Sequence, residues 1–254
     1  MSTARKLIVA AVVVVVLAVG AGIWWFLRDD APAEADLETA VSAVQDDSGS
    51  DDAASVDAGP DGSVGLDGDI AGAWTVDNET GEFTYESATG TFAGFRIEEE
   101  LAGVGSTTAV GRTDDVSGGI TIDGTTLTDA TFEVDLTGIT TETSRRDDQV
   151  QRALDTDEFP TATFTLADPV DLGDAAAAGD PITVTATGDL TIHGVTRSVV
   201  LDVEAQLVDG TIVLVASTEL TFSDFDVSVP SSPAVLSVDD HGILEVQILL
   251  VPGA

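Results

Sequence analysis

Few side chains of this 254-residue chain could carry out chemistry near neutral pH. There are two histidines, His193 and His241, and no cysteine. The sequence contains no G-x-S-x-G nucleophile elbow, no H-E-x-x-H zinc motif and no glycine-rich phosphate-binding loop. Its 46 acidic residues make carboxylate pairs so frequent that they indicate nothing about glycosidase chemistry. We therefore expect a protein that is not an enzyme, holds no metal and uses no cofactor.

His193 lies in the stretch GDLTIHGVTRSVVLDV, residues 188–203. Apolar and polar residues alternate on both sides of it, and the histidine is in phase with the polar residues Asp189 and Thr191. Because Gly194 follows directly, one interpretation is a polar corner where a strand turns. The other is a polar contact at the mouth of a ligand cavity. The spacing alone leaves both open.

The elements around His193 are short segments of period-two alternation, rich in Val, Ile, Thr and Phe, which dominate the chain from Trp74 onward. The clearest cover residues 130–136, 182–192, 199–207 and 244–250. Each has one apolar face and one polar face, which predicts half-buried antiparallel strands.

One amphipathic helix interrupts these strands. It is predicted to begin at Ser144, with Asp147 placed as in a capping box, and to end before the turn-forming residues 155–160. Many strands with one short helix are typical of a barrel or a sandwich, and periodicity does not choose between them.

Two segments resemble the paired signature of the YceI-like family, the polyisoprenoid-binding proteins of the bacterial periplasm. The first, SRRDDQVQRALDTDEFPTATF at 144–164, contains Arg146-Asp147, which matches an Arg-Asp that a short helix follows in the family, and a Phe-Pro-x-Ala-x-Phe passage. The second is GDLTIHGVT at 188–196. The segments WTVD at 74–77 and FSDFDVSVP at 222–230 are also similar to family features, so the resemblance covers about residues 73–251.

The chain departs from the family pattern in two places. The segment NETGEF at 78–83 stands where the family commonly has His-Ser, and Asp226 stands where glycine is usual. Both departures concern the detail of the pocket rather than the fold.

The resemblance implies an all-β, eight-stranded antiparallel barrel, lipocalin-like, with one short helix and a long apolar cavity for an isoprenoid or other lipid chain. A barrel of this size holds packed side chains or one small ligand, and the small residues Ala130, Ala162, Ala186 and Gly188 would leave gaps in it. We predict that the ligand contacts come from Phe95, Phe132, Val134, Leu136, Phe164, Leu190, Ile192, Val199 and Leu201. The head group is expected near some of the few cations, Arg112, Arg145, Arg146, Arg152 and Arg197.

The N-terminus contains a run of 21 uncharged residues, Leu7 to Leu27. At a rise of about 1.5 Å per residue, this run can cross a hydrocarbon core about 30 Å thick. We expect residues 1–28 to form a single transmembrane signal anchor, with a cleaved signal peptide as the alternative. Arg5 and Lys6 precede the span and acidic residues follow it, which predicts a cytoplasmic N-terminus and an extracytoplasmic C-terminal domain at the cell membrane.

Residues 29–72, between the anchor and the strands, contain 13 acidic residues and no basic residue. Most of the other residues in this range are Ala, Gly, Ser and Pro. This composition predicts a disordered acidic linker, followed by a YceI-like lipid-binding barrel at 73–254.

The formal net charge of -37 disfavours nucleic acid as a partner. We expect a membrane-anchored, extracytoplasmic binding or carrier protein for an isoprenoid, quinone-like or fatty-acyl amphiphile. The alternative is a cell-surface protein-interaction or wall-binding β-domain with a filled core and no lipid ligand. The sequence leaves the oligomeric state open, with a homodimer as one candidate.

Overall fold

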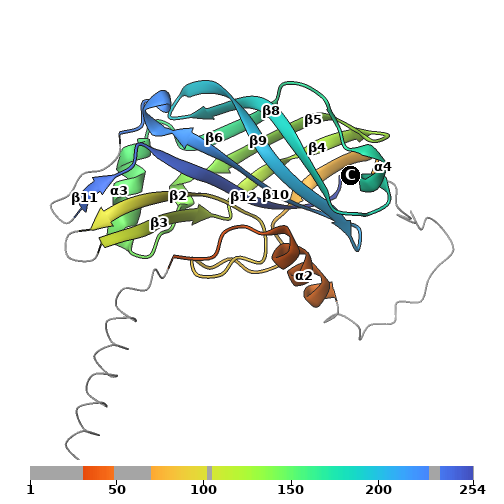
Figure 1. The fold of residues 1–254 in the computed structure, drawn as a ribbon, viewed down its shortest axis with the longest axis horizontal. Helices are drawn as coiled ribbons and strands as arrows, with labels where there is room; N and C mark the ends of the chain where they lie inside the picture. Colours follow the sequence, from red (N-terminus) through yellow and green to blue (C-terminus); the bar gives the residue numbers. More distant parts are fainter. Residues whose placement is uncertain (1–30, 49–69, 102–104, 229–234, 254) are drawn as a thin grey trace, which may run out of the picture.

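A computed structural model describes residues 31–48, 70–101, 105–228 and 235–253 (Figure 1). The predicted transmembrane segment, the acidic stretch 49–69 and part of the FSDFDVSVP segment lie outside these residues. Within the described ranges, no helix is both long enough and apolar enough to cross a membrane.

Strands make up most of the described chain, as the period-two alternation predicts. They are β1 (Gly72–Asp77), β2 (Phe92–Leu101), β3 (Gly105–Thr113), β4 (Val116–Asp123), β5 (Thr126–Asp135), β6 (Thr161–Leu166), β7 (Val170–Asp171), β8 (Ile182–Ile192), β9 (Val195–Val208), β10 (Thr211–Thr221), β11 (Val235–Val238) and β12 (His241–Pro252). The helices are α2 (Leu37–Ser48), α3 (Ser144–Leu154) and α4 (Gly173–Ala177), with 3-10 turns η1 (Leu136–Gly138) and η2 (Phe222–Phe225).

Eight of these strands form a closed antiparallel barrel. Their order is β1-β4-β5-β6-β8-β9-β10-β12, and the ring closes because β12 pairs back onto β1. One stretch of β12 pairs with β1 and the preceding stretch pairs with β2, so β1 and β2 follow one another along the same edge of β12. The predicted eight-stranded antiparallel barrel is therefore confirmed.

The helix α3 has the predicted bounds, but its start differs in detail from a capping box. The N-cap residue is Thr143, and no side chain caps the helix. The carboxylate of Asp147 instead accepts hydrogen bonds from the backbone N–H and the hydroxyl of Thr141, each at 2.7 Å. Asp147 thus ties the preceding loop to the first turn of α3. Figure 1 shows α3 at one end of the barrel and α4 at the other.

Residues 31–48, which we call the N-terminal arm, pack against the outside of the barrel. Asp36 caps α2, since its Oδ1 accepts a hydrogen bond from Thr39 N at 2.9 Å. The apolar residues Leu37, Ala40, Val41 and Val44 then recur at helical spacing and bury one stripe of the helix. Their partners on β9, β10 and β12 are Val208, Val213, Val215 and Leu249.

The predicted disordered linker over 29–72 is therefore wrong for residues 31–48. The average composition of this region conceals a narrow apolar stripe, and the surface that covers the stripe exists only once the barrel has folded.

Beside α2, the arm covers an ionic cluster on the outer face of β2, β3 and β12. Arg96 Nε lies 2.9 Å from Glu245 Oε2, and Arg112 Nη2 lies 2.7 Å from Glu245 Oε1. The two arginines also donate hydrogen bonds to the carbonyl oxygens of Pro32 and Ala33. Arg112, expected near the cavity mouth, thus lies outside the barrel and under the arm.

Candidate functional site

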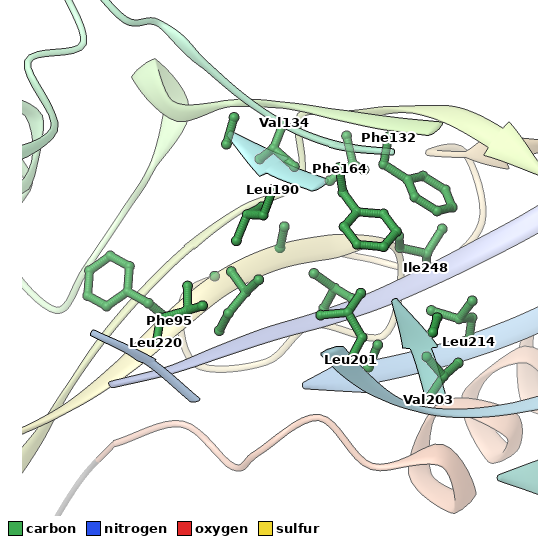
Figure 2. Close-up of a pocket in the computed structure, with 18 of the residues that line it drawn as sticks. Phe95, Phe132, Val134, Phe164, Leu190, Leu201, Val203, Leu214, Leu220 and Ile248 are labelled. Atoms are coloured by element: carbon green, nitrogen blue, oxygen red, sulfur yellow. The ribbon is translucent and has the colours of Figure 1, made fainter. Parts of the chain in front are cut away.

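The barrel encloses a cavity of about 310 Å³. Its lining includes Val150 and Leu154 of α3 at one end and Ala176 of α4 at the other, so the cavity extends along most of the barrel. Its volume lies at the lower end of the range of about 300–1,000 Å³ that is usual for small-molecule sites. Figure 2 labels ten of the lining residues, and all ten are aliphatic or aromatic.

The lining follows from strand periodicity, because every second residue of a barrel strand points inward. On β5 the inward residues are Ala130, Phe132 and Val134, and on β8 they include Val184, Ala186 and Leu190. Apolar side chains of β9, β10 and β12 complete the wall, among them Leu201, Val203, Leu214, Val246 and Ile248.

Eight of the nine residues predicted to contact a ligand line this cavity. They are Phe95, Phe132, Val134, Leu136, Phe164, Leu190, Ile192 and Leu201. Their contact with a ligand stays a prediction.

Val199 is the exception and is not part of the lining. It has the inward phase of its strand, but it packs against a cluster formed by Leu190, Leu220 and Phe225. These side chains fill the space at that end of β9.

Several lining residues were not among the predicted contacts. Leu214, Val246 and Ile248 have the same alternating phase on β10 and β12, so their pattern was available in the sequence. Glu99 was also missed, although it continues the inward phase of Ala93, Phe95 and Ile97 on β2.

Small residues keep part of the interior open. Ala130, Ala162 and Ala186 line the cavity as expected. Gly188 does not provide a gap, because the ring of Phe164 occupies the space beside it. A Cβ at Gly188 would lie 2.3 Å from Phe164 Cζ. Phe164 and Phe132 are paired across β5 and β6, and Figure 2 shows them side by side.

His193 forms the corner between β8 and β9. Its φ is 52° and that of Gly194 is 71°, the positive values that the two central residues of a tight hairpin turn require. Its Nδ1 lies 3.3 Å from the carbonyl oxygen of Phe225, and its ring packs edge-on against Phe159 with centroids 4.8 Å apart. The corner interpretation is confirmed, and His193 is not part of the cavity lining.

The backbone conformation of segment 222–228 accounts for an aspartate at position 226, where the family usually has glycine. Residues Phe222–Phe225 form the 3-10 turn η2, and Asp226 follows with a φ of 56°. This left-handed conformation favours glycine, and Asp is among the residues that tolerate it. Asp226 therefore adopts the conformation that ends η2, and Phe225 of that turn is buried.

Polar groups occur at the ends of the cavity. At the α3 end, Glu99, Arg146 and Gln149 contribute to the lining. Arg146 Nη2 lies 2.8 Å from Glu99 Oε1 and 3.1 Å from Glu142 Oε1. The contact with Glu99 is an ion pair, and the buried Glu99 Oε1 accepts no hydrogen bond from the described protein.

At the α4 end the polar lining residues are Asp180 and Gln206. Gln206 Nε2 donates a hydrogen bond to Gly179 O at 3.2 Å, and Asp180 is exposed to solvent. Among the residues that the structure describes, no group of three or more His, Asp or Glu side chains is placed to hold a metal ion. The site is thus an apolar cavity with polar ends.

Solved structures share this fold. A polyisoprenoid-binding domain from Saccharophagus degradans, implicated in plant cell wall breakdown, aligns with a TM-score of 0.53 and 19% identity, covering 71% of this chain and 98% of that one. BcnA from Burkholderia cenocepacia aligns with a TM-score of 0.49 and 18% identity over 62% of this chain and 95% of its own. The YceI protein of Campylobacter jejuni aligns with a TM-score of 0.44 and 23% identity over 55% of this chain and 82% of its own.

Identities this low bear on the fold alone, and TM-scores below 0.5 support no further conclusion. No curated protein matches the sequence. The model of the YceI-like domain family, however, matches residues 74–250, which is well over half of the chain and covers the barrel from β1 to β12. The chain therefore belongs to the YceI-like domain family.

Proposed function

We propose that the barrel binds an isoprenoid, quinone-like or fatty-acyl amphiphile in its cavity, and that the protein carries this ligand outside the cytoplasm while anchored in the membrane. The observation that carries the proposal is the apolar cavity of about 310 Å³ that extends from α3 to α4. An elongated apolar chain has the shape and the surface chemistry of this space.

The energetics support a lipid-like ligand. An apolar cavity forgoes the packing contacts of a filled core, and an apolar ligand restores them. Each buried methylene contributes about 0.8 kcal/mol, so ten contribute about 8 kcal/mol. That gain is of the size needed to offset the entropy lost on association, about 4–15 kcal/mol.

Family membership and the Saccharophagus degradans neighbour support an isoprenoid as the first ligand to test. That protein's domain is described as polyisoprenoid-binding. It shares the fold of this chain across nearly its whole length.

The membrane anchor and the extracytoplasmic location are parts of the same proposal. They are supported by the uncharged run Leu7 to Leu27 and by Arg5 and Lys6 before it. A lipid carrier attached in this way would exchange its ligand with the adjacent bilayer.

A binding role fits the chemistry of the cavity better than catalysis does. His193 is occupied in a turn, and His241 is exposed beside Asp239 on the surface. The alternative of a wall-binding or protein-binding β-domain required a filled core, and the cavity argues against it.

The test compares the lipid content of two matched variants in a soluble form that begins at Ala31. Ala186→Phe places a ring inside the cavity, whereas Thr185→Phe places the same ring on the exposed face of β8. Native mass spectrometry with solvent extraction should find lipid in the wild type and in Thr185→Phe, and little in Ala186→Phe. Wild-type protein that carries no lipid and takes up no isoprenoid, quinone or fatty-acyl probe would refute the carrier function.

A further inference from the structure

We propose that the cavity selects a ligand whose head group is uncharged and donates a hydrogen bond to Glu99, and that it rejects anionic head groups such as phosphate and diphosphate. This inference rests on the proposed lipid-binding function and specifies the ligand class. Alcohols, primary amides and quinols have the required chemistry.

Glu99 is the group in the cavity that can accept a further hydrogen bond from a ligand. It lies on the inward face of β2, lines the cavity and is only 7% exposed. Its Oε1 lies 2.8 Å from Arg146 Nη2 in an ion pair but accepts no hydrogen bond from the described protein. A carboxylate oxygen can accept more than one hydrogen bond, so a hydroxyl or amide N–H that a ligand places here would satisfy an acceptor that the ion pair leaves without a hydrogen bond.

The charge balance at this end opposes an anion. Arg146 is the one basic side chain among the described residues that line the cavity. Its Nη2 already contacts carboxylate oxygens of both Glu99 and Glu142, so a single guanidinium faces two carboxylates. To pair with Arg146, a phosphate would have to displace the carboxylate of Glu99 from the guanidinium. That would leave a buried carboxylate without a counter-charge.

Other charged groups on α3 do not change this balance. Asp147 accepts hydrogen bonds from Thr141 and adds further negative charge. Arg152 pairs with Asp148 at 3.9 Å on the exposed side of the helix. Arg145 is also exposed and is not part of the lining.

The α4 end provides no better place for an anion. Its polar lining consists of the carboxylate Asp180 and the amide Gln206, whose Nε2 is already bonded to Gly179 O. A head group is therefore best satisfied at the α3 end, with the chain directed along the cavity past Phe164 and Phe132 (Figures 1 and 2).

The experiment uses the full chain in phosphatidylcholine nanodiscs and a long-chain isoprenoid alcohol that carries a photoreactive diazirine. Labelled peptides from the barrel strands are quantified by mass spectrometry. Unlabelled geranylgeraniol and geranylgeranyl diphosphate then compete for the site. Because both competitors partition into the same bilayer for every variant, the ratio of their potencies can be compared between variants.

We expect the alcohol to compete at least about tenfold better than the diphosphate in the wild type. In Glu99→Gln, which keeps the shape and removes the charge, Arg146 becomes available and the ratio should fall by about tenfold. The matched control is Glu98→Gln, the exposed neighbour on the outer face of β2, which should leave the ratio unchanged.

The outcomes separate the two proposals. If labelling never reaches the barrel peptides, the lipid-binding function fails and this inference fails with it. If the barrel is labelled but the diphosphate competes as well as the alcohol in the wild type, the function stands and the head-group selectivity is overturned. This wild-type comparison needs no variant to fold. An unchanged ratio in a folded Glu99→Gln would also overturn the assignment to Glu99.

Discussion

Arg112 Nη2 lies 2.7 Å from Glu245 Oε1 on the outer face of the barrel, and both side chains are only 3% exposed. The other carboxylate oxygen of Glu245 binds Arg96, and carbonyl groups of the N-terminal arm accept hydrogen bonds from both guanidiniums. The ring of Phe92 lies 4.5 Å from Arg112 Cζ. The arm therefore completes a buried ionic cluster and is part of the folded domain.

Replacing Glu245 by Gln should lower the free energy of unfolding by about 3–5 kcal/mol, because it leaves two buried guanidiniums without their counter-charge. Urea unfolding followed by tryptophan fluorescence measures this change. Glu219→Gln, on the exposed surface of the neighbouring strand β10, is the control and should shift stability by no more than about 0.5 kcal/mol. Equal effects of the two substitutions would contradict the role assigned to the cluster.

A form of the protein that begins at Ile70 should be less stable than one that begins at Ala31. Removing the arm exposes the apolar patch under α2 and takes the carbonyl partners from Arg96 and Arg112. We expect a lower Tm in differential scanning calorimetry, and recovery on addition of a peptide of residues 31–48. A scrambled peptide is the control, and identical Tm values for the two forms would show that the arm contributes nothing.

The attachment of α2 should weaken in acid. Hydrogen bonds from the backbone N–H and then the hydroxyl of Thr39 hold the pKa of Asp36 below its ordinary value. Because the pKa of the folded form is lowered, the stabilisation is complete above the unfolded pKa of about 3.9 and is lost as the pH falls through the folded pKa.

Asp36→Ala should accordingly cost about 1 kcal/mol near neutral pH. That corresponds to about fivefold faster hydrogen exchange of the α2 amides. The difference from wild type should vanish in strong acid, whereas the exposed Glu34→Ala should behave as wild type throughout. A difference that grows with falling pH would contradict the capping role.

Gly188 and Phe164 should show strong energetic coupling. Gly188→Ala is expected to destabilise the barrel by about 1–3 kcal/mol, since the added methyl overlaps the Phe164 ring. Phe164→Leu in the same background should recover part of this loss, because the smaller side chain makes room. A double-mutant cycle from urea unfolding measures the coupling, and additive effects would argue against the contact.

Much of the fold was accessible from the sequence because strand periodicity is a local property. The alternation in residues 130–136 and 182–192 placed Phe132, Ala186 and Leu190 on the inward face, and the barrel places them there. The helix at Ser144–Leu154 was equally readable, since its apolar positions and its end are encoded within eleven residues.

Other features depend on segments that are distant in the chain. The apolar stripe of α2 is stabilised only when β9, β10 and β12 provide the surface that it packs against. The composition of this region alone therefore predicted a disordered linker. Val199 has an inward phase like Leu201, yet its place outside the lining depends on Phe225 and Leu220 packing against it. Nothing in the sequence distinguished Arg112 from the other arginines expected near the head group. Its pairing opposite Gly94 and its ion pair with Glu245 show that it faces outward.

By itself, the sequence determined the strand-rich domain, the amphipathic helix at Ser144–Leu154 and the apolar inward faces, since each follows from spacing between near neighbours. Tertiary structure decided which gaps stay open, as at Ala186, and which are filled, as at Gly188. It also decided that Glu99 meets Arg146 at one end of the cavity while Glu245 meets Arg112 outside it. Such pairings depend on how the barrel closes, because closure brings together residues that no local pattern connects.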